Sequence, residues 1–137
     1  MPHLISFLKR LAALALPLLI GTSTMAQAQP PKADIILHLT GNHLSIEDEI
    51  WIPEDGDYRV QLEVRKTGKS GRATTHQGNS IKAEADHVYQ TSHMHLVLGH
   101  GDHIEAKLSL FSKDSLLVTT TRNYTFDAPA PDTHNHL

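Results

Sequence analysis

The sequence predicts an all-β domain, a seven-stranded immunoglobulin-like β-sandwich. The stretch Tyr58–Lys66 alternates without a break between apolar and polar residues, as expected for a strand with one buried face and one wet face. Further short alternating stretches are separated by turns rich in glycine, proline and aspartate, and none of them has a helical period. Short strands spaced in this way are typical of β-sandwiches and barrels.

The first 28 residues predict a secretory signal peptide. Lys9 and Arg10 are followed by the apolar run Leu11–Ile20, and then by small and polar residues that end in Ala26–Ala28. A basic region, an apolar stretch and an Ala-x-Ala motif in this order are typical of such signals. The apolar run is shorter than a membrane-spanning helix needs. We therefore expect cleavage after Ala28 and an exported protein without membrane insertion.

The rest of the chain divides into a leader, one domain and a tail. Residues 29–33 include two prolines and predict a flexible leader, residues 34–126 form the sandwich domain, and residues 127–137 predict a disordered, histidine-containing tail. The seven strands are expected at residues 34–40, 44–52, 58–66, 80–85, 92–98, 104–111 and 116–126.

Four local features carry specific expectations. Regular alternation would place Asp48 on the buried face, so we predict a bulge or a break near Glu47–Glu49. Residues 86–89 are expected to be a connection, and Gly99–Asp102 a hairpin turn. The polar strand at residues 80–85 is expected at a sheet edge, where charged side chains oppose unwanted pairing.

Composition excludes several classes of function. Loss of the signal leaves 10 of the 12 basic residues against 15 acidic residues, which opposes general nucleic-acid binding. Cysteine is absent, which excludes disulfides, thiolate metal sites and cysteine nucleophiles. Neither a Gly-x-Ser-x-Gly elbow, a His-Glu-x-x-His helix nor a phosphate-binding glycine loop occurs, so no enzyme is predicted.

Histidine is unusually frequent, with 11 residues in the chain. His93 and His95 share a strand face at i and i+2, and His100 and His103 follow in the next turn. Imidazole binds zinc and copper, so a metal-binding β-sandwich that uses these four side chains is an alternative hypothesis. A polar strand face is the favoured interpretation, because a metal site also needs converging ligands. We therefore predict no metal and no other cofactor.

Basic residues gather on the strand at residues 58–66 and on the turn after it. Arg59, Arg65, Lys66, Lys69 and Arg72 lie within 14 residues of one another. Such a stripe can steer an acidic polypeptide towards the domain. A solvated strand face is the simpler interpretation, because antiparallel sheets commonly expose one polar side.

Several of these segments together resemble the curli-assembly chaperone family, CsgC and CsgH. The resemblance rests on Tyr58–Leu62, on Lys69–Arg72 and on the alternating strands at residues 94–98, 104–110 and 115–118, and it extends over residues 34–126. It implies a small periplasmic immunoglobulin-like protein that keeps the curli subunit from forming amyloid. The CsgC branch carries a Cys-x-Cys pair where this chain has Gly56–Tyr58, so the cysteine-free CsgH branch is more similar and no redox role is expected.

The leading hypothesis is therefore a periplasmic chaperone that inhibits premature amyloid formation by curli-type fibre subunits during curli assembly. Its expected partner is an unfolded or early-assembled subunit, and the protein itself is expected to be a monomer that binds no nucleic acid. The polar face of the strand at residues 58–66 would bind this client through Arg59, Gln61, Glu63 and Arg65. A structural, adhesin-like module is a third hypothesis, beside the metal-binding sandwich.

Overall fold

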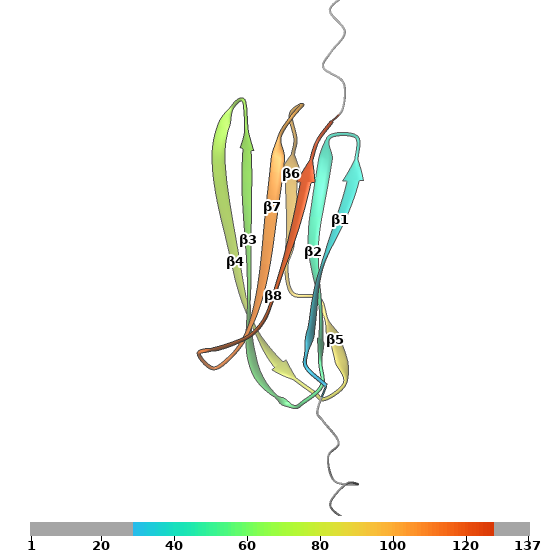
Figure 1. The fold of residues 1–137 in the computed structure, drawn as a ribbon. Helices are drawn as coiled ribbons and strands as arrows, with labels where there is room; N and C mark the ends of the chain where they lie inside the picture. Colours follow the sequence, from blue (N-terminus) through green and yellow to red (C-terminus); the bar gives the residue numbers. More distant parts are fainter. Residues whose placement is uncertain (1–28, 128–137) are drawn as a thin grey trace, which may run out of the picture.

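The computed structural model describes residues 29–127, and these fold into two antiparallel sheets that pack face to face (Figure 1). Its strands are β1 (Lys32–Thr40), β2 (His43–Ile52), β3 (Gly56–Gly68), β4 (Gly71–Ala83), β5 (His87–Tyr89), β6 (His93–Val97), β7 (His103–Ser112) and β8 (Ser115–Thr125). The predicted all-β sandwich is confirmed, with eight strands in place of seven. The predicted signal peptide and residues 128–137 of the predicted tail lie outside the described residues.

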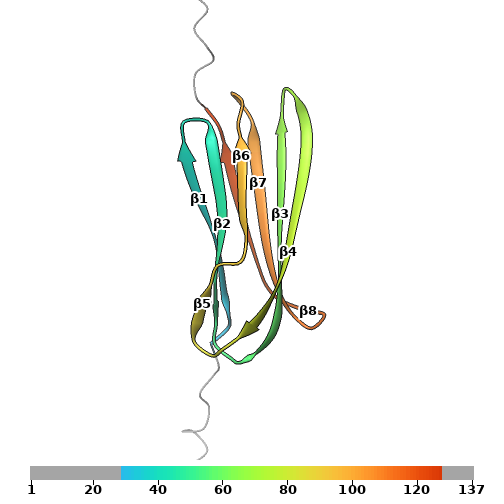
Figure 2. The same cartoon turned by 180° about the vertical axis from the view of Figure 1, so that it is seen from behind.

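The two sheets divide the strands unequally along the chain. Sheet I contains β1, β2, β5 and β6, and β2 pairs with β6 along its first half and with β5 at its end (Figure 2). Sheet II has the strand order β4-β3-β7-β8. No helix in the described part of the chain is long and apolar enough to cross a membrane.

The core lies between the two sheets and follows the predicted alternation. On β3, Val60, Leu62 and Val64 are buried, whereas Arg59 and Arg65 are exposed. Sheet I contributes Ile35, Leu44, Ile46, Ile50, Ile52 and Met94 to the core, and sheet II adds Ile81, Ile104, Ala106, Leu108 and Leu110. Each fully buried aliphatic side chain of this kind contributes about 1.5–3 kcal/mol.

The predicted bulge near Glu47–Glu49 is wrong. The β1–β2 register runs without interruption from Lys32 opposite Trp51 to Thr40 opposite His43. Asp48 is therefore fully buried. Its carboxylate accepts hydrogen bonds from Thr91 N at 2.6 Å, from Thr91 Oγ1 at 2.6 Å and from Ser92 N at 3.0 Å. A buried carboxylate is tolerated where such donors converge on it, and these come from 43 and 44 residues further along the chain.

Two predicted connections also differ from the structure. Residues 87–89 form the short strand β5, because they pair with the end of β2 at Ile50–Ile52. Residues 99–102 do not form a hairpin, since β6 belongs to sheet I and β7 to sheet II. The segment instead crosses between the sheets and is tied to the end of β8 by Gly101 N→Phe126 O and Phe126 N→Asp102 O, at 2.8 and 2.9 Å.

Two strand boundaries differ from prediction as well. β1 begins at Lys32, so the last two residues of the predicted leader belong to the first strand. β4 occupies Gly71–Ala83 and pairs with β3 over its whole length, whereas a strand was expected only at residues 80–85. Its predicted position at a sheet edge is confirmed. The polar composition of residues 72–80 concealed this strand, because most of its side chains face solvent.

Candidate functional site

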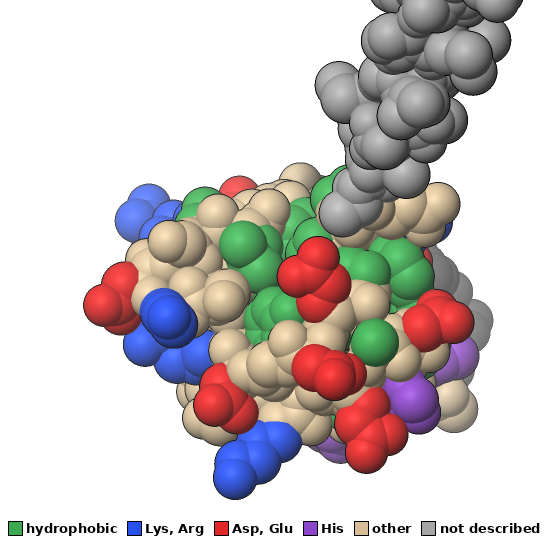
Figure 3. All heavy atoms as spheres, turned by 90° about the horizontal axis from the view of Figure 1, so that it is seen from below, with side chains coloured by type: hydrophobic (Ala, Val, Ile, Leu, Met, Phe, Trp, Pro, Cys, Tyr) green, Lys and Arg blue, Asp and Glu red, His purple; other side chains and the backbone are tan. Residues whose placement is uncertain are grey.

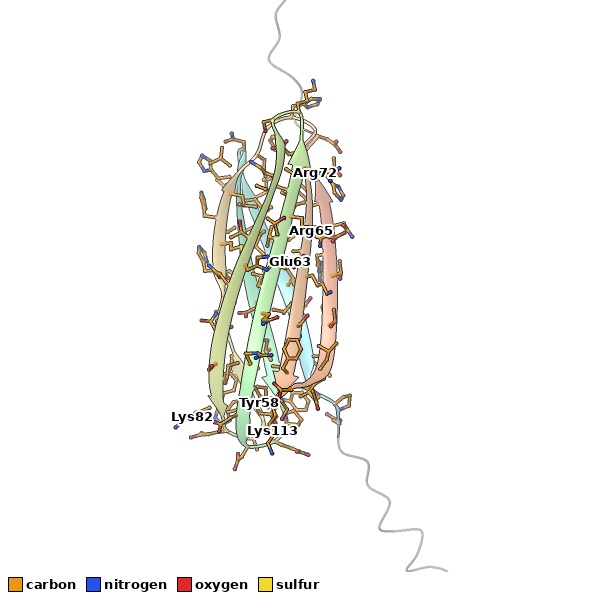
Figure 4. All side chains as sticks on the ribbon, turned by 90° about the vertical axis from the view of Figure 1, so that its left-hand side faces the viewer. Tyr58, Glu63, Arg65, Arg72, Lys82 and Lys113 are labelled. Atoms are coloured by element: carbon orange, nitrogen blue, oxygen red, sulfur yellow. The ribbon has the colours of Figure 1, made fainter. Side chains whose placement is uncertain are left out.

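The outer face of sheet II carries all four residues predicted to bind a client. Arg59, Gln61, Glu63 and Arg65 point away from the core, because they alternate with the buried residues of β3. Figure 4 looks onto this face, with β3 between β4 and β7 and with Glu63 and Arg65 labelled near its middle. We call this surface the β3 face.

The sheet register supplies neighbours that the sequence did not assign to this surface. Across β4 and β7, Arg59 lies between Ser80 and Phe111, Gln61 between Gly78 and Ser109, Glu63 between His76 and Lys107, and Arg65 between Thr74 and Glu105. The β3 face therefore combines both signs of charge with one aromatic ring. Sequence reasoning missed β4 and β7 here because strand pairing joins positions far apart in the chain.

Arg59 contributes packing as well as charge. Its guanidinium carbon lies 4.8 Å from the centroid of the Phe111 ring, which is the geometry of a cation–π contact. Leu116 lies opposite Phe111 on β8 and is 56% exposed. This end of the β3 face therefore offers an apolar spot beside a cation, which suits a chain segment with mixed apolar and acidic side chains.

The positive charge of Arg65 is offset by a neighbouring carboxylate. Its Nε is 3.0 Å from Glu63 Oε1, and His76 Nδ1 is 3.6 Å from Glu63 Oε2. Such exposed ion pairs contribute under about 1 kcal/mol, but they reduce the local positive field. The Lys66 side chain does not contribute to the positive stripe. Its Nζ donates to Val97 O at 3.3 Å and lies 3.9 Å from Asp102 Oδ2. The predicted positive stripe is therefore divided, and Arg59 is its least compensated member on β3.

The surface has shallow hollows on and beside the β3 face. One of about 190 Å³ is lined by Gln61, Glu63, His76, Lys107, Ser109, Phe111, Leu116 and Thr119. Another of about 360 Å³ lies where β3 begins, with Tyr58, Arg59, Lys82 and Lys113 in its lining, and Figure 4 shows Tyr58 and Lys113 together at this end. Open hollows that follow one another along a sheet can accommodate an extended polypeptide better than a compact small molecule, which needs an enclosed cavity.

The free edge of β6 is covered by side chains from sheet II. Gln77 on β4 holds the His93 backbone at both groups, with Nε2→His93 O at 2.9 Å and His93 N→Oε1 at 3.2 Å. Asn79 Nδ2 donates to Thr91 O at 3.0 Å. Together with the Lys66 ammonium on Val97 O, these bonds occupy backbone groups that another strand would need.

On the opposite side of the sandwich, side chains of β8 in sheet II bond to β1 in sheet I. Thr120 Oγ1 on β8 donates to Ala33 O on β1 at 2.7 Å, and Arg122 Nη2 lies 3.0 Å from Asp34 Oδ1. Within residues 29–127, no strand pairs with the outer edge of β4, which is 13 residues long. The other edge strand of sheet II, β8, has 11 residues, so β4 is the longer of the two edges at which an extended chain could add, and it borders the β3 face.

An acidic end adjoins the β3 face. Figure 3 shows carboxylates gathered around apolar side chains at this end, with lysine and arginine side chains along one margin, where the β2–β3 turn, the β4–β5 connection and the β7–β8 turn lie. Partial burial raises the pKa of Tyr58 above its ordinary value of 10.0, and the nearby carboxylates of Glu54 and Asp55 raise it further. The Tyr58 hydroxyl donates to Glu54 O at 3.2 Å.

The four histidines of the metal hypothesis do not converge. His93 and His95 lie on β6 in sheet I, whereas His103 begins β7 in sheet II with its Nδ1 2.8 Å from Thr125 Oγ1. His93 is paired with Glu47, at 3.1 Å between Nδ1 and Oε1. Among residues 29–127, no group of three or more histidine, aspartate or glutamate side chains is placed to hold a metal ion together.

Comparison with solved structures finds similar proteins, among them two curli proteins. The E. coli curli protein CsgC superposes with a TM-score of 0.57 at 16% identity, and the match covers 69% of this chain and 97% of that one. CsgH from R. palustris gives a TM-score of 0.53 at 20% identity, covering 69% of this chain and 91% of that one. No protein-family model and no curated protein sequence matches the chain. The domain therefore has the fold of CsgC and CsgH, the two proteins that the sequence resembles.

Proposed function

We propose that this protein is a curli-assembly factor, a periplasmic chaperone that inhibits premature amyloid formation by curli-type fibre subunits. The observation that carries the proposal is the likeness of the whole β-sandwich to CsgC and CsgH, which agrees with the resemblance in the β3 and β3–β4 sequences. The protein would act by binding, without catalysis and without a cofactor. The signal would direct export and be cleaved after Ala28, and mass spectrometry of periplasmic protein should then find a chain that starts at Gln29.

The protected β6 edge supports such a role. Amyloid grows when a strand adds its backbone groups to an exposed edge in register. A protein that handles an amyloidogenic chain must bind it without becoming part of the fibre. The side chains of Gln77, Asn79 and Lys66 cover the β6 edge, so this edge offers few free backbone groups to the client.

The β3 face would then receive the client. Arg59, with Phe111 beneath it and Leu116 beside it, would supply an anchor of mixed apolar and cationic character. Gln61, Glu63 and Arg65 would continue the contact along the strand with hydrogen-bonding and charged groups. Because acidic residues outnumber basic ones in the chain, attraction of this kind would be confined to one surface.

The test is inhibition of fibre formation by a purified curli subunit, followed by thioflavin fluorescence at substoichiometric chaperone. The double variant Arg59→Glu/Arg65→Glu changes the charge of the β3 face by four units. We expect it to shorten the lag time relative to wild type. Wild-type inhibition should also weaken as salt rises, since charge attraction is screened beyond about 8–10 Å at physiological ionic strength.

The matched control is Lys32→Glu/Arg122→Glu, which changes net charge equally at residues outside the positive stripe and the β3 face. It should keep the wild-type lag time. If the Arg59/Arg65 variant is folded and inhibits as well as wild type does, the β3 face is not the binding surface and the open β4 edge becomes the candidate. If wild-type protein leaves the lag time unchanged at every concentration, the chaperone function itself is wrong.

A further inference from the structure

Two exposed histidines face each other on the outer surface of sheet I. His43 at the start of β2 and His95 in the middle of β6 are diagonal neighbours, since His43 lies opposite Val97 and Ser45 lies opposite His95. Their ring centroids are 5.2 Å apart, and His43 Nδ1 lies 3.0 Å from His95 Nε2. The sequence could not pair these two residues, because they are 52 positions apart.

We propose that His43 and His95 form a two-histidine site for a first-row divalent metal ion, with water in the remaining coordination positions. The site differs from the one suggested by the sequence and shares only His95 with it. It does not depend on the proposed function, since it lies on sheet I and the β3 face lies on sheet II.

The spacing of the two nitrogens fits neighbouring ligands of one metal ion. Imidazole nitrogens bind Zn²⁺ at about 2.0–2.1 Å, so two nitrogens 3.0 Å apart subtend an angle of roughly 95° at the ion. Both rings are exposed, so small side-chain rotations can turn both lone pairs towards a common point.

The surroundings of the pair also favour a metal ion. Neither ring has an ion-pair partner within 4.0 Å among residues 29–127, whereas the adjacent His93 is engaged by Glu47. Affinity of imidazole sites rises along the divalent series to Cu²⁺ and falls again at Zn²⁺. We therefore expect Cu²⁺ to bind most tightly, with Ni²⁺ and Zn²⁺ weaker.

The experiment is a titration of ¹⁵N-labelled full-length protein with CuCl₂, read by paramagnetic broadening of individual amide resonances. Substoichiometric Cu²⁺ should broaden the amides around residues 43–45 and 94–97 first. His43→Asn or His95→Asn should weaken binding at this location on the order of tenfold or more, since even supporting residues of metal sites are worth about 10–100-fold in affinity. The control His87→Asn removes a histidine from β5 of the same sheet, at the other end of β2, and should leave the local affinity unchanged.

Local broadening separates this site from the other histidines of the chain. Loss of signal near residues 43–45 and 94–97 that disappears in both single variants, but persists in His87→Asn, supports the proposal. Broadening confined to other histidines overturns it, and so does unchanged local affinity in His43→Asn and His95→Asn. All three substitutions are at exposed positions, and unchanged circular dichroism of each variant would establish that it is folded.

Discussion

Removal of the Asp48 carboxylate should cost this domain a large part of its stability. The side chain is fully buried and accepts three hydrogen bonds, two from Thr91 and one from the Ser92 backbone. Asp48→Ala would leave the amides of Thr91 and Ser92 without their acceptor and would open a small space in the core. An unsatisfied buried donor costs about 1–3 kcal/mol, and this substitution leaves two backbone donors in that state.

We therefore expect Asp48→Ala to lower the free energy of unfolding by about 2–6 kcal/mol, out of a total of about 5–15 kcal/mol for a typical domain. Asp48→Asn keeps one acceptor oxygen and should lose less, about 1–3 kcal/mol. Glu49→Ala, the exposed neighbour on the same strand, is the control and should stay within about ±0.5 kcal/mol of wild type.

The assay is urea denaturation followed by circular dichroism, which gives the midpoint and the slope separately. The residues that Asp48 holds lead directly into β6, so hydrogen exchange should also quicken for β6 in Asp48→Ala before it does for β3 or β7. An Asp48→Ala midpoint equal to that of Glu49→Ala would refute the reasoning, because it would mean that the carboxylate contributes nothing to the fold.

Three further predictions test the core, one close contact and one titration. Val60→Asp should unfold the domain while Arg59→Glu stays within about 0.5 kcal/mol of wild type, and equal loss of circular dichroism would contradict the assigned faces. Gly68→Ala should cost about 1–3 kcal/mol in thermal melts, because its methyl group would lie 2.9 Å from Asp102 Cγ; an unchanged melting temperature would show that this carboxylate moves freely. The raised pKa of Tyr58 implies stability that is complete below the unfolded value of 10.0 and is lost as pH rises through the folded value. Alkaline absorbance titration of wild type and Tyr58→Phe should locate this group above its ordinary range, and a normal titration would contradict it.

The local alternation of the sequence determined the fold class and the two faces of β3. A strand displays successive side chains on opposite sides, so Val60, Leu62 and Val64 could be assigned to the core without knowledge of any partner strand. The placement of Arg59, Gln61, Glu63 and Arg65 on one outer face follows from the same geometry. That these four residues bind a client remains a prediction.

Tertiary structure decided the features that depend on pairs distant in the chain. The burial of Asp48 needed donors from Thr91 and Ser92, so alternation alone suggested a bulge where the strand is regular. The contact of Arg59 with Phe111 and the pairing of His43 with His95 arise from strand register, which places residues 52 positions apart within one hydrogen-bond distance. A one-residue shift in register would exchange the faces of a strand, so these neighbours are fixed by the packing of both sheets around one core.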